Sequence, residues 1–170
     1  MTRKENILTN VSYGYRISQN HSEILKKYMA QVPVRVGSLA EELGLRVVLA
    51  TLPLNISGMI QPEGEDKFVV KVNRFESKER QRFTIAHEIA HFLLHKDYIK
   101  NGVVDSVLYR SNLSSRLEAE ANKLAADIVM PSQAIASEIS DIFDMSHDDR
   151  VAHLAEKFQV SRQAMSIRIG

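Results

Sequence analysis

The sequence contains no cysteine. A disulfide framework and a thiolate zinc site are therefore both excluded, and any metal ion must be held by histidine, aspartate or glutamate side chains. The absence of disulfides also fits a reducing compartment, so we expect a cytoplasmic protein.

Long hydrophobic runs are absent as well. No stretch approaches the ~18 apolar residues of a membrane span, and residues 1–10 contain no apolar run that could serve as a signal peptide. The net charge is only +1 at pH 7, which provides no broad basic surface for nucleic acid. These absences predict a soluble protein without a membrane partner, and they do not favour tight nucleic-acid binding by the whole chain.

The chain does have enough hydrophobic material for one core. Its 170 residues, 44% of them hydrophobic, predict a single compact domain. After a polar segment over residues 1–20, a short amphipathic helix is expected over Glu23–Met29. The spacing of Ser38 and Glu41 matches a capping box, which predicts a second short helix that Gly44 ends.

Three segments with the composition of β-strands follow. They are Leu45–Thr51, Ile56–Gln61 and Lys67–Asn73, and the last has apolar residues at the alternate positions Phe68, Val70 and Val72. The Pro62–Asp66 stretch, which contains Gly64, predicts a hairpin turn between the second and third strands. We therefore expect an α+β fold in which a small, largely antiparallel sheet precedes a helical half.

Residues 87–91 read His-Glu-Ile-Ala-His. Positions i and i+4 share one face of a helix, so His87 and His91 can both reach a zinc ion at ~2.0–2.1 Å. Glu88 is rotated by about 100° from His87, so it lies beside the ion and can take a proton from a water molecule as a general base. The residues from Phe83 to Leu94 are otherwise almost all apolar, which predicts a buried helix whose polar groups need partners.

The flanks of this helix carry their own signals. Ser77 is a suitable N-cap. Between Lys96 and Asn112 the sequence becomes loop-like around Asn101-Gly102, and this segment could frame a cleft.

A catalytic zinc site generally has three protein ligands, so one more is needed. His95 follows His91 by four residues, but on a straight helix it lies about 12 Å from His87, too far to share the ion. We interpret His95 as a polar residue near the helix end, where the helix dipole favours a cation.

A second apolar helix is predicted from Ser115 to Met130. Glu118 on this helix could complete a His2Glu site, and Asn122, on the same face, could hydrogen-bond an imidazole and orient it. Glu120 points about 200° away from Glu118 and should serve differently. The spacing of Ser115 and Glu118 also matches a capping box, in which Glu118 would only cap the helix. If one ion bridges the two helices, they must pack together through small residues on a shared face, which we expect among Ala86, Ala90, Ala121 and Ala125.

Two stretches, RFTIAHEIAHFLLH over 82–95 and EAEANKLAADIVMP over 118–131, resemble the ImmA/IrrE family of zinc metallopeptidases. An HExxH motif followed by an E-x-E-A-N helix that ends in Met-Pro is far more specific than HExxH alone. With the preceding sheet, the resemblance covers roughly residues 35–170. It implies a compact zincin-like α+β fold related to gluzincins. It also implies one Zn²⁺ held by His87, His91 and Glu118, with Glu88 as the catalytic base.

The resemblance also suggests a biological role. Members described as regulators cleave a helix-turn-helix repressor and so switch on phage, mobile-element or stress-response genes. Many members have Asp where this chain has Asn122, and a neutral amide should support the imidazole less strongly.

The C-terminal segment Leu154–Met165 reads as helix, tight turn, helix, with Ser161 capping the second helix. This pattern is typical of a helix-turn-helix. The second helix carries only Arg162 and Arg168 as cations, which leaves little for phosphate contacts. Packing on the core, or a grip on a partner, is therefore favoured over direct DNA binding.

Together these observations predict one metallopeptidase domain over 1–170. It comprises an N-terminal arm and helix over 1–35, a catalytic core over 36–145 and a helical pair over 146–170. The leading hypothesis is a zinc-dependent endopeptidase that cleaves a helix-turn-helix transcriptional repressor. The alternative is a non-proteolytic regulator, or a component of a toxin–antitoxin type, that binds a repressor or DNA and holds a structural zinc. An intact Glu88 and an open fourth position argue for hydrolysis.

Overall fold

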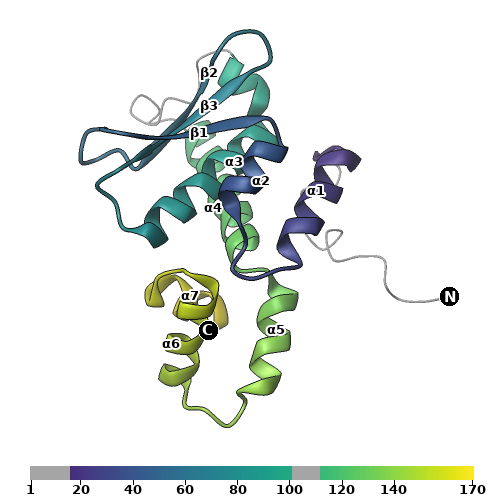
Figure 1. The fold of residues 1–170 in the computed structure, drawn as a ribbon, viewed down its shortest axis with the longest axis vertical. Coiled ribbons are helices and arrows are strands. Elements are labelled where there is room, and N and C mark those ends of the chain that lie inside the picture. Colours follow the sequence, from purple (N-terminus) through teal and green to yellow (C-terminus); the bar gives the residue numbers. More distant parts are fainter. Residues whose placement is uncertain (1–15, 101–111) are drawn as a thin grey trace, which may run out of the picture.

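The computed structural model describes residues 16–100 and 112–170. Over these residues the fold is α+β, as expected, with seven helices and a three-stranded sheet (Figure 1). The segment around Asn101-Gly102, where a loop was expected, lies outside the described residues. The part of the chain before it is helical as far as Lys100.

The sheet consists of β1 (Leu45–Ala50), β2 (Gly58–Pro62) and β3 (Phe68–Asn73), in the order β1-β3-β2. The expected hairpin joins β2 to β3, which pair antiparallel with Ile60 opposite Val70. However, β1 pairs with β3 in parallel, so the sheet is mixed and the prediction of a largely antiparallel sheet was wrong. The chain forms β2 at the far edge and returns through the centre, so β3 runs in the same direction as β1.

The central strand β3 is buried on both faces, since Phe68, Val69, Val70 and Val72 are all nearly inaccessible. A strand covered on both faces needs apolar residues almost throughout, which this sequence supplies. At its end, the buried amide of Asn73 donates to the carbonyls of Leu52, Pro53 and Ile56. This amide fixes the path of the chain between β1 and β2.

The helix that carries the histidine motif is α3 (Lys78–Lys100). Its N-cap is Ser77, as predicted, because the Ser77 hydroxyl accepts from the backbone N–H of Arg80 at 3.2 Å. At Gly58 on β2, an added Cβ would lie only 2.4 Å from the Thr84 side chain, so glycine permits the close approach of β2 to α3. The backbone departs from helical geometry at His95, with φ −130° and ψ 25°.

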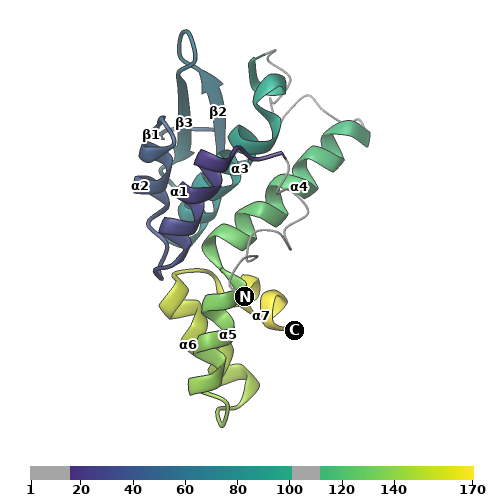
Figure 2. The ribbon, with the colours of Figure 1, turned by 90° about the vertical axis from the view of Figure 1, so that its right-hand side faces the viewer.

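The second apolar helix, α4 (Asn112–Val129), packs along α3, as Figure 2 shows. The four alanines proposed for the contact face are each 0% exposed, as such a face requires: Ala86, Ala90, Ala121 and Ala125. Side chains this small let the two helices approach closely. Because α4 begins at Asn112, Ser115 lies inside the helix and is not its N-cap, so the capping-box interpretation of Glu118 was wrong.

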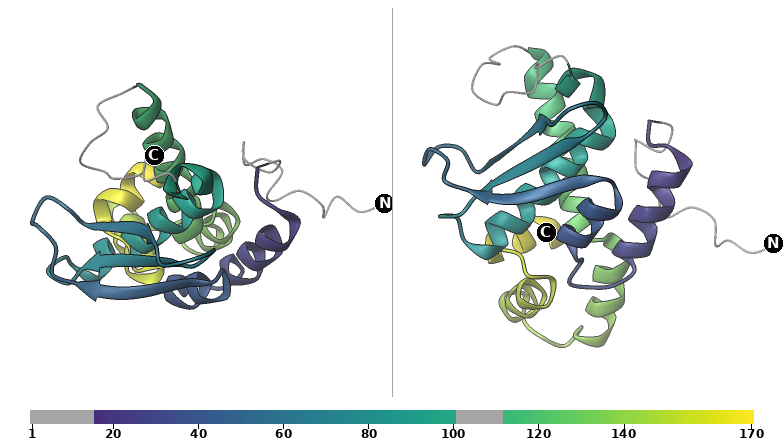
Figure 3. Two further views of the ribbon diagram at one scale, coloured as in Figure 1. Left: turned by 90° about the horizontal axis from the view of Figure 1, so that it is seen from above. Right: turned by 45° about the horizontal axis from the view of Figure 1, so that its top comes forward.

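Two short helices precede the sheet and lie beside each other near the start of β1 (Figure 3). They are α1 (Gln19–Met29), capped by Ser18, and α2 (Val36–Glu42). The prediction that α2 opens at Ser38 was wrong by two residues, because Val36 already belongs to the helix and no side chain caps it. Gly44 ends it as expected, with φ +83°, a conformation that glycine adopts at little cost.

The lower part of the molecule in Figure 1 contains α5 (Ser132–Asp141), α6 (His147–Phe158) and α7 (Arg162–Ile169). The predicted helix-turn-helix is confirmed, and the Ser161 hydroxyl accepts from the N–H of Ala164. Leu154, Phe158 and Met165 are fully buried. Burying a large apolar side chain stabilises a fold by roughly 1.5–3 kcal/mol, so this pair is a packed element of the core.

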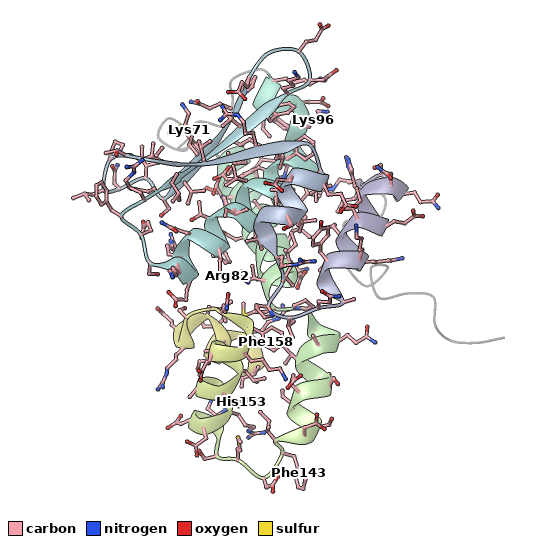
Figure 4. All side chains as sticks on the ribbon, viewed as in Figure 1. Lys71, Arg82, Lys96, Phe143, His153 and Phe158 are labelled. Carbon is pink, nitrogen blue, oxygen red and sulfur yellow. The ribbon has the colours of Figure 1, made fainter. Side chains whose placement is uncertain are left out.

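Arg82 lies where the upper and lower parts of the molecule meet, close to Phe158 (Figure 4). Its guanidinium donates to the carbonyls of Val34, Phe158 and Gln159. The first residues of α3 are thereby tied to the C-terminal helices. Within residues 16–100 and 112–170, no helix is both long and apolar enough to cross a membrane.

Candidate metal centre

The packing of α3 on α4 brings three of the predicted residues together. The Nε2 atoms of His87 and His91 lie 3.0 Å apart. The carboxylate of Glu118 lies 3.2 Å from the first of these nitrogens and 3.1 Å from the second. Among the residues that the structure describes, these three form the group of histidine and acidic side chains that could hold a metal ion.

The dimensions of this group fit zinc. A tetrahedral zinc ion with ligands at ~2.0–2.1 Å requires its ligand atoms to lie about 3.3 Å apart. The three distances, 3.0 to 3.2 Å, are within a few tenths of an ångström of that value. Two imidazole nitrogens and one carboxylate oxygen also match the donors that zinc accepts.

The surroundings differ from one side of the group to the other. The side chain of His91 is 2% exposed, that of His87 is 16% exposed and that of Glu118 is 43% exposed. Hydrogen bonds from His87 and His91 hold the pKa of the Glu118 carboxyl far below its usual range. Burial alone would lower the pKa of His87, but the carboxylates of Glu118 and Glu88 outweigh burial and raise it. The group is therefore closed at His91 and open toward Glu118.

Glu88, the predicted general base, is buried beside the two histidines. Burial raises the pKa of its carboxyl, and the positive charge that His87 and His91 can carry opposes this rise. A carboxyl group in such surroundings binds a proton more readily than one in water. This environment is suited to accepting a proton and releasing it again.

Asn122 lies on α4, one turn beyond Glu118, and its side chain is exposed. A hydrogen bond between its side chain and the His87 imidazole is one of the causes that raise the pKa of that imidazole. Nevertheless, the buried Nδ1 of His87 has no hydrogen-bond partner among the described residues. Asn122 therefore acts on the His87 imidazole, as predicted, without providing a partner for its Nδ1.

Two further residues take part that the sequence did not assign to the site. His95 is 1% exposed, and its Nδ1 lies 3.0 Å from the Nδ1 of His91. Its Nε2 lies 3.0 Å from Glu120, which serves a different purpose from Glu118, as expected. The backbone leaves helical geometry at His95, so its place at the end of a helical segment is as expected. The expectation of a cation there was wrong, because burial lowers the pKa of its imidazole. The i, i+4 spacing of His91 and His95 was the available signal.

A groove of about 1300 Å³ lies between the first turns of α3 and helices α6 and α7. Phe83 belongs to its lining, and the Phe83 ring lies 6.4 Å from the His87 ring, centre to centre. The groove thus comes within one helical turn of His87.

Comparison with known proteins agrees with this geometry. Residues 40–170 match the family model Peptidase_M78, described as the IrrE N-terminal-like domain. No curated protein matches the chain. Among solved structures, the chain is similar to a Mycobacterium tuberculosis transcriptional regulator, with 16% sequence identity and a TM-score of 0.59. The similarity covers 90% of this chain but 48% of the regulator, so it concerns the fold of about half of that protein. Since the family model spans most of the sequence, the chain belongs to the Peptidase_M78 family of IrrE N-terminal-like domains.

Proposed function

We propose that this protein is a zinc-dependent endopeptidase. The observation that carries the proposal is the convergence of His87, His91 and Glu118 at 3.0 to 3.2 Å, with the buried carboxyl of Glu88 beside them. Membership of a peptidase family supports the same reaction class. In this proposal, the two histidines and Glu118 hold one zinc ion, and no second ion is needed.

Each side chain then has a defined task. When bound, zinc would acidify a water molecule and polarise the carbonyl of the scissile peptide bond. Glu88 accepts a proton from the attacking water and passes it to the leaving amine nitrogen. The raised pKa of Glu88 suits this transfer, because a carboxyl that binds protons more readily is a better base. The exposure of Glu118 leaves an opening through which a peptide can reach these groups.

We further propose that the substrate is a helix-turn-helix transcriptional repressor and that cleavage derepresses the genes it controls. Two observations support this part. The chain belongs to the Peptidase_M78 family, and the resemblance to ImmA/IrrE proteins implies this role. A solved structure with a similar fold is a transcriptional regulator. In this proposal the chain acts on a repressor and does not itself read DNA.

The C-terminal helical pair supports a protein partner over DNA. Arg168, one of the two cations of α7, donates to Asp127, to the carbonyl of Met130 and to Ser132. It is thus engaged in holding α7 against α4 and α5. Of the two cations, only Arg162 is left exposed for a phosphate, far fewer contacts than DNA-binding helices make.

The substitution Glu88→Gln tests the enzymatic part. It keeps the volume of the side chain and leaves His87, His91 and Glu118 unchanged, so the protein should still fold and bind zinc. The amide cannot take a proton, so hydrolysis should fall by roughly a hundredfold or more. Wild type and variant are incubated with the candidate repressor, and the fragments are measured by mass spectrometry.

The outcomes separate the two functions. Loss of fragments with retained binding of the repressor supports the peptidase. Cleavage by the variant at the wild-type rate would remove Glu88 from the mechanism. If neither protein yields fragments and derepression in cells is unchanged by the substitution, the protein is a non-proteolytic regulator.

A further inference from the structure

Behind His91, a line of polar contacts runs away from the metal centre to the surface. His91 Nδ1 lies 3.0 Å from His95 Nδ1, and His95 Nε2 lies 3.0 Å from Glu120 Oε2. The same oxygen of Glu120 accepts from Arg16 at 3.0 Å. The contacts join α3 and α4 to the segment that precedes α1, because Glu120 belongs to α4 and Arg16 lies before α1.

Only one arrangement of protons satisfies this line when His91 binds a metal ion. A neutral imidazole has one N–H and one nitrogen lone pair. With the lone pair of Nε2 directed at the ion, the hydrogen of His91 must be on Nδ1 and is donated to His95. His95 then accepts at Nδ1 and carries its own hydrogen on Nε2. That hydrogen is donated to Glu120, whose carboxylate only accepts.

Burial makes this arrangement consequential. His91 and His95 are 2% and 1% exposed, so water is not available to replace a missing partner. Glu120 is 21% exposed and is further held by Arg16, so the line ends at a charged pair near the surface. His87 differs, because its Nδ1 has no partner among the described residues.

We propose that His95 is a positioning residue for the metal centre, which fixes the tautomer and the ring orientation of His91 and is itself oriented by Glu120. This inference rests on the proposed metal site. Groups that hold the second nitrogen of a ligating histidine typically change metal affinity by roughly 10- to 100-fold. Glu120 and Arg16 act through His95 and touch neither the ion nor the substrate.

The test is the zinc affinity of the full chain, measured by competition with a chelating indicator. His95→Leu removes both hydrogen bonds and should weaken zinc binding by roughly 10- to 100-fold. His95→Gln should stay closer to wild type, since its amide oxygen can accept from His91 and its amide nitrogen can donate to Glu120. Glu120→Gln keeps an acceptor without the charge and should have a smaller effect than His95→Leu. His147→Gln, a change at an exposed histidine of α6, is the control.

The results separate a failure of the metal site from a failure of the positioning role. If wild type binds no zinc, the metal site itself is wrong. If wild type binds zinc and His95→Leu binds it equally well, the site stands and the positioning role is overturned. Equal losses in His95→Leu and His95→Gln would also overturn it, because the shape of the ring would then matter and its hydrogen bonds would not.

A second measurement does not depend on whether His95→Leu folds. In long-range ¹H–¹⁵N spectra of the zinc-loaded wild type, His91 should be protonated at Nδ1 and His95 at Nε2. A His95 ring protonated at Nδ1, or a His91 ring that binds zinc through Nδ1, would contradict the proposal.

Discussion

The two histidines of the candidate metal centre lie in different surroundings. His91 is buried, and its second ring nitrogen faces His95, Glu120 and Arg16 in succession. His87 lies one turn earlier on α3, is more exposed, and has a second ring nitrogen without a partner among the described residues. The second ring nitrogen of His91 is thus held by a hydrogen-bond partner, whereas that of His87 is not.

This difference assigns different roles to the two sides of the site: the side of His91 holds the ion, and the side of His87 and Glu118 admits the substrate. The side of His91 is closed by the packing of α3 on α4 and has its hydrogen bonds defined in advance. The side of His87 and Glu118 is more open, and Phe83, next to His87, lines the groove in front of α6 and α7. In our account, His91 anchors the ion, and the opening at Glu118 leaves access to Glu88.

The largest expected effect comes from removing the carboxylate on the open side. Glu118→Ala deletes one of three proposed ligands and should weaken zinc binding by more than about a hundredfold. Glu120→Ala, the matched control two residues away, should cost at most about tenfold, because it acts only through His95. Zinc content after dialysis, with the dissociation constant from competition, measures both. Equal losses, or none in either variant, would mean that the wrong carboxylate has been chosen.

In the metal-free protein, the interaction of Glu118 with His87 should make the stability of the fold depend on pH. The pKa of Glu118 is lowered, so its contribution is present above its unfolded pKa of ~4.3 and is lost as the pH falls toward the lower folded value. The pKa of His87 is raised, so its contribution is present below its unfolded pKa of ~6.5 and is lost as the pH rises through the folded value. Both contributions are present together between about pH 4.3 and 6.5.

The measurement is thermal unfolding of the chelator-treated protein across this range. The Tm of wild type should exceed that of Glu118→Gln by most between these two pH values. The difference should shrink toward both extremes. A Tm difference that does not vary with pH would show that the carboxylate and the histidines do not interact in the metal-free protein.

The third prediction concerns a variant that gives the His87 imidazole a stronger hydrogen-bond acceptor, and its effect should be the smallest of the three. Asn122→Asp places a carboxylate beside the imidazole of His87, whose buried Nδ1 has no partner among the described residues. A carboxylate accepts an imidazole N–H more strongly than an amide oxygen does. Zinc affinity should therefore rise by a few-fold, up to about tenfold. Weaker binding in the variant would mean that His87 takes no support from this position.

Local spacing explains what could be predicted from the sequence. The i, i+4 relation of His87 and His91, the Ser77 cap and the four contact alanines all depend on the geometry of single helices. Each of these helix features was therefore visible without the fold. The choice of Glu118 needed only the additional requirement that two apolar helices share an ion.

The features that the sequence did not predict depend on contacts between segments that are far apart in the chain. The apolar residues of β3 suit a parallel and an antiparallel neighbour equally well, so the sequence did not reveal that β1 pairs in parallel. His95 was judged by its distance from an expected helix end, but its surroundings come from Glu120 and Arg16. Arg16 lies 104 residues from Glu120 in the sequence, and no local pattern connects the two.

The most direct test of the central claim is a crystal structure of the purified protein with anomalous diffraction recorded on both sides of the zinc absorption edge. Our account predicts one zinc ion per chain, with the Nε2 atoms of His87 and His91 and one oxygen of Glu118 at ~2.0–2.2 Å from it. A water molecule should occupy the remaining position on the side of Glu88. Zinc bound elsewhere, or a fourth protein ligand that closes the site, would contradict the account.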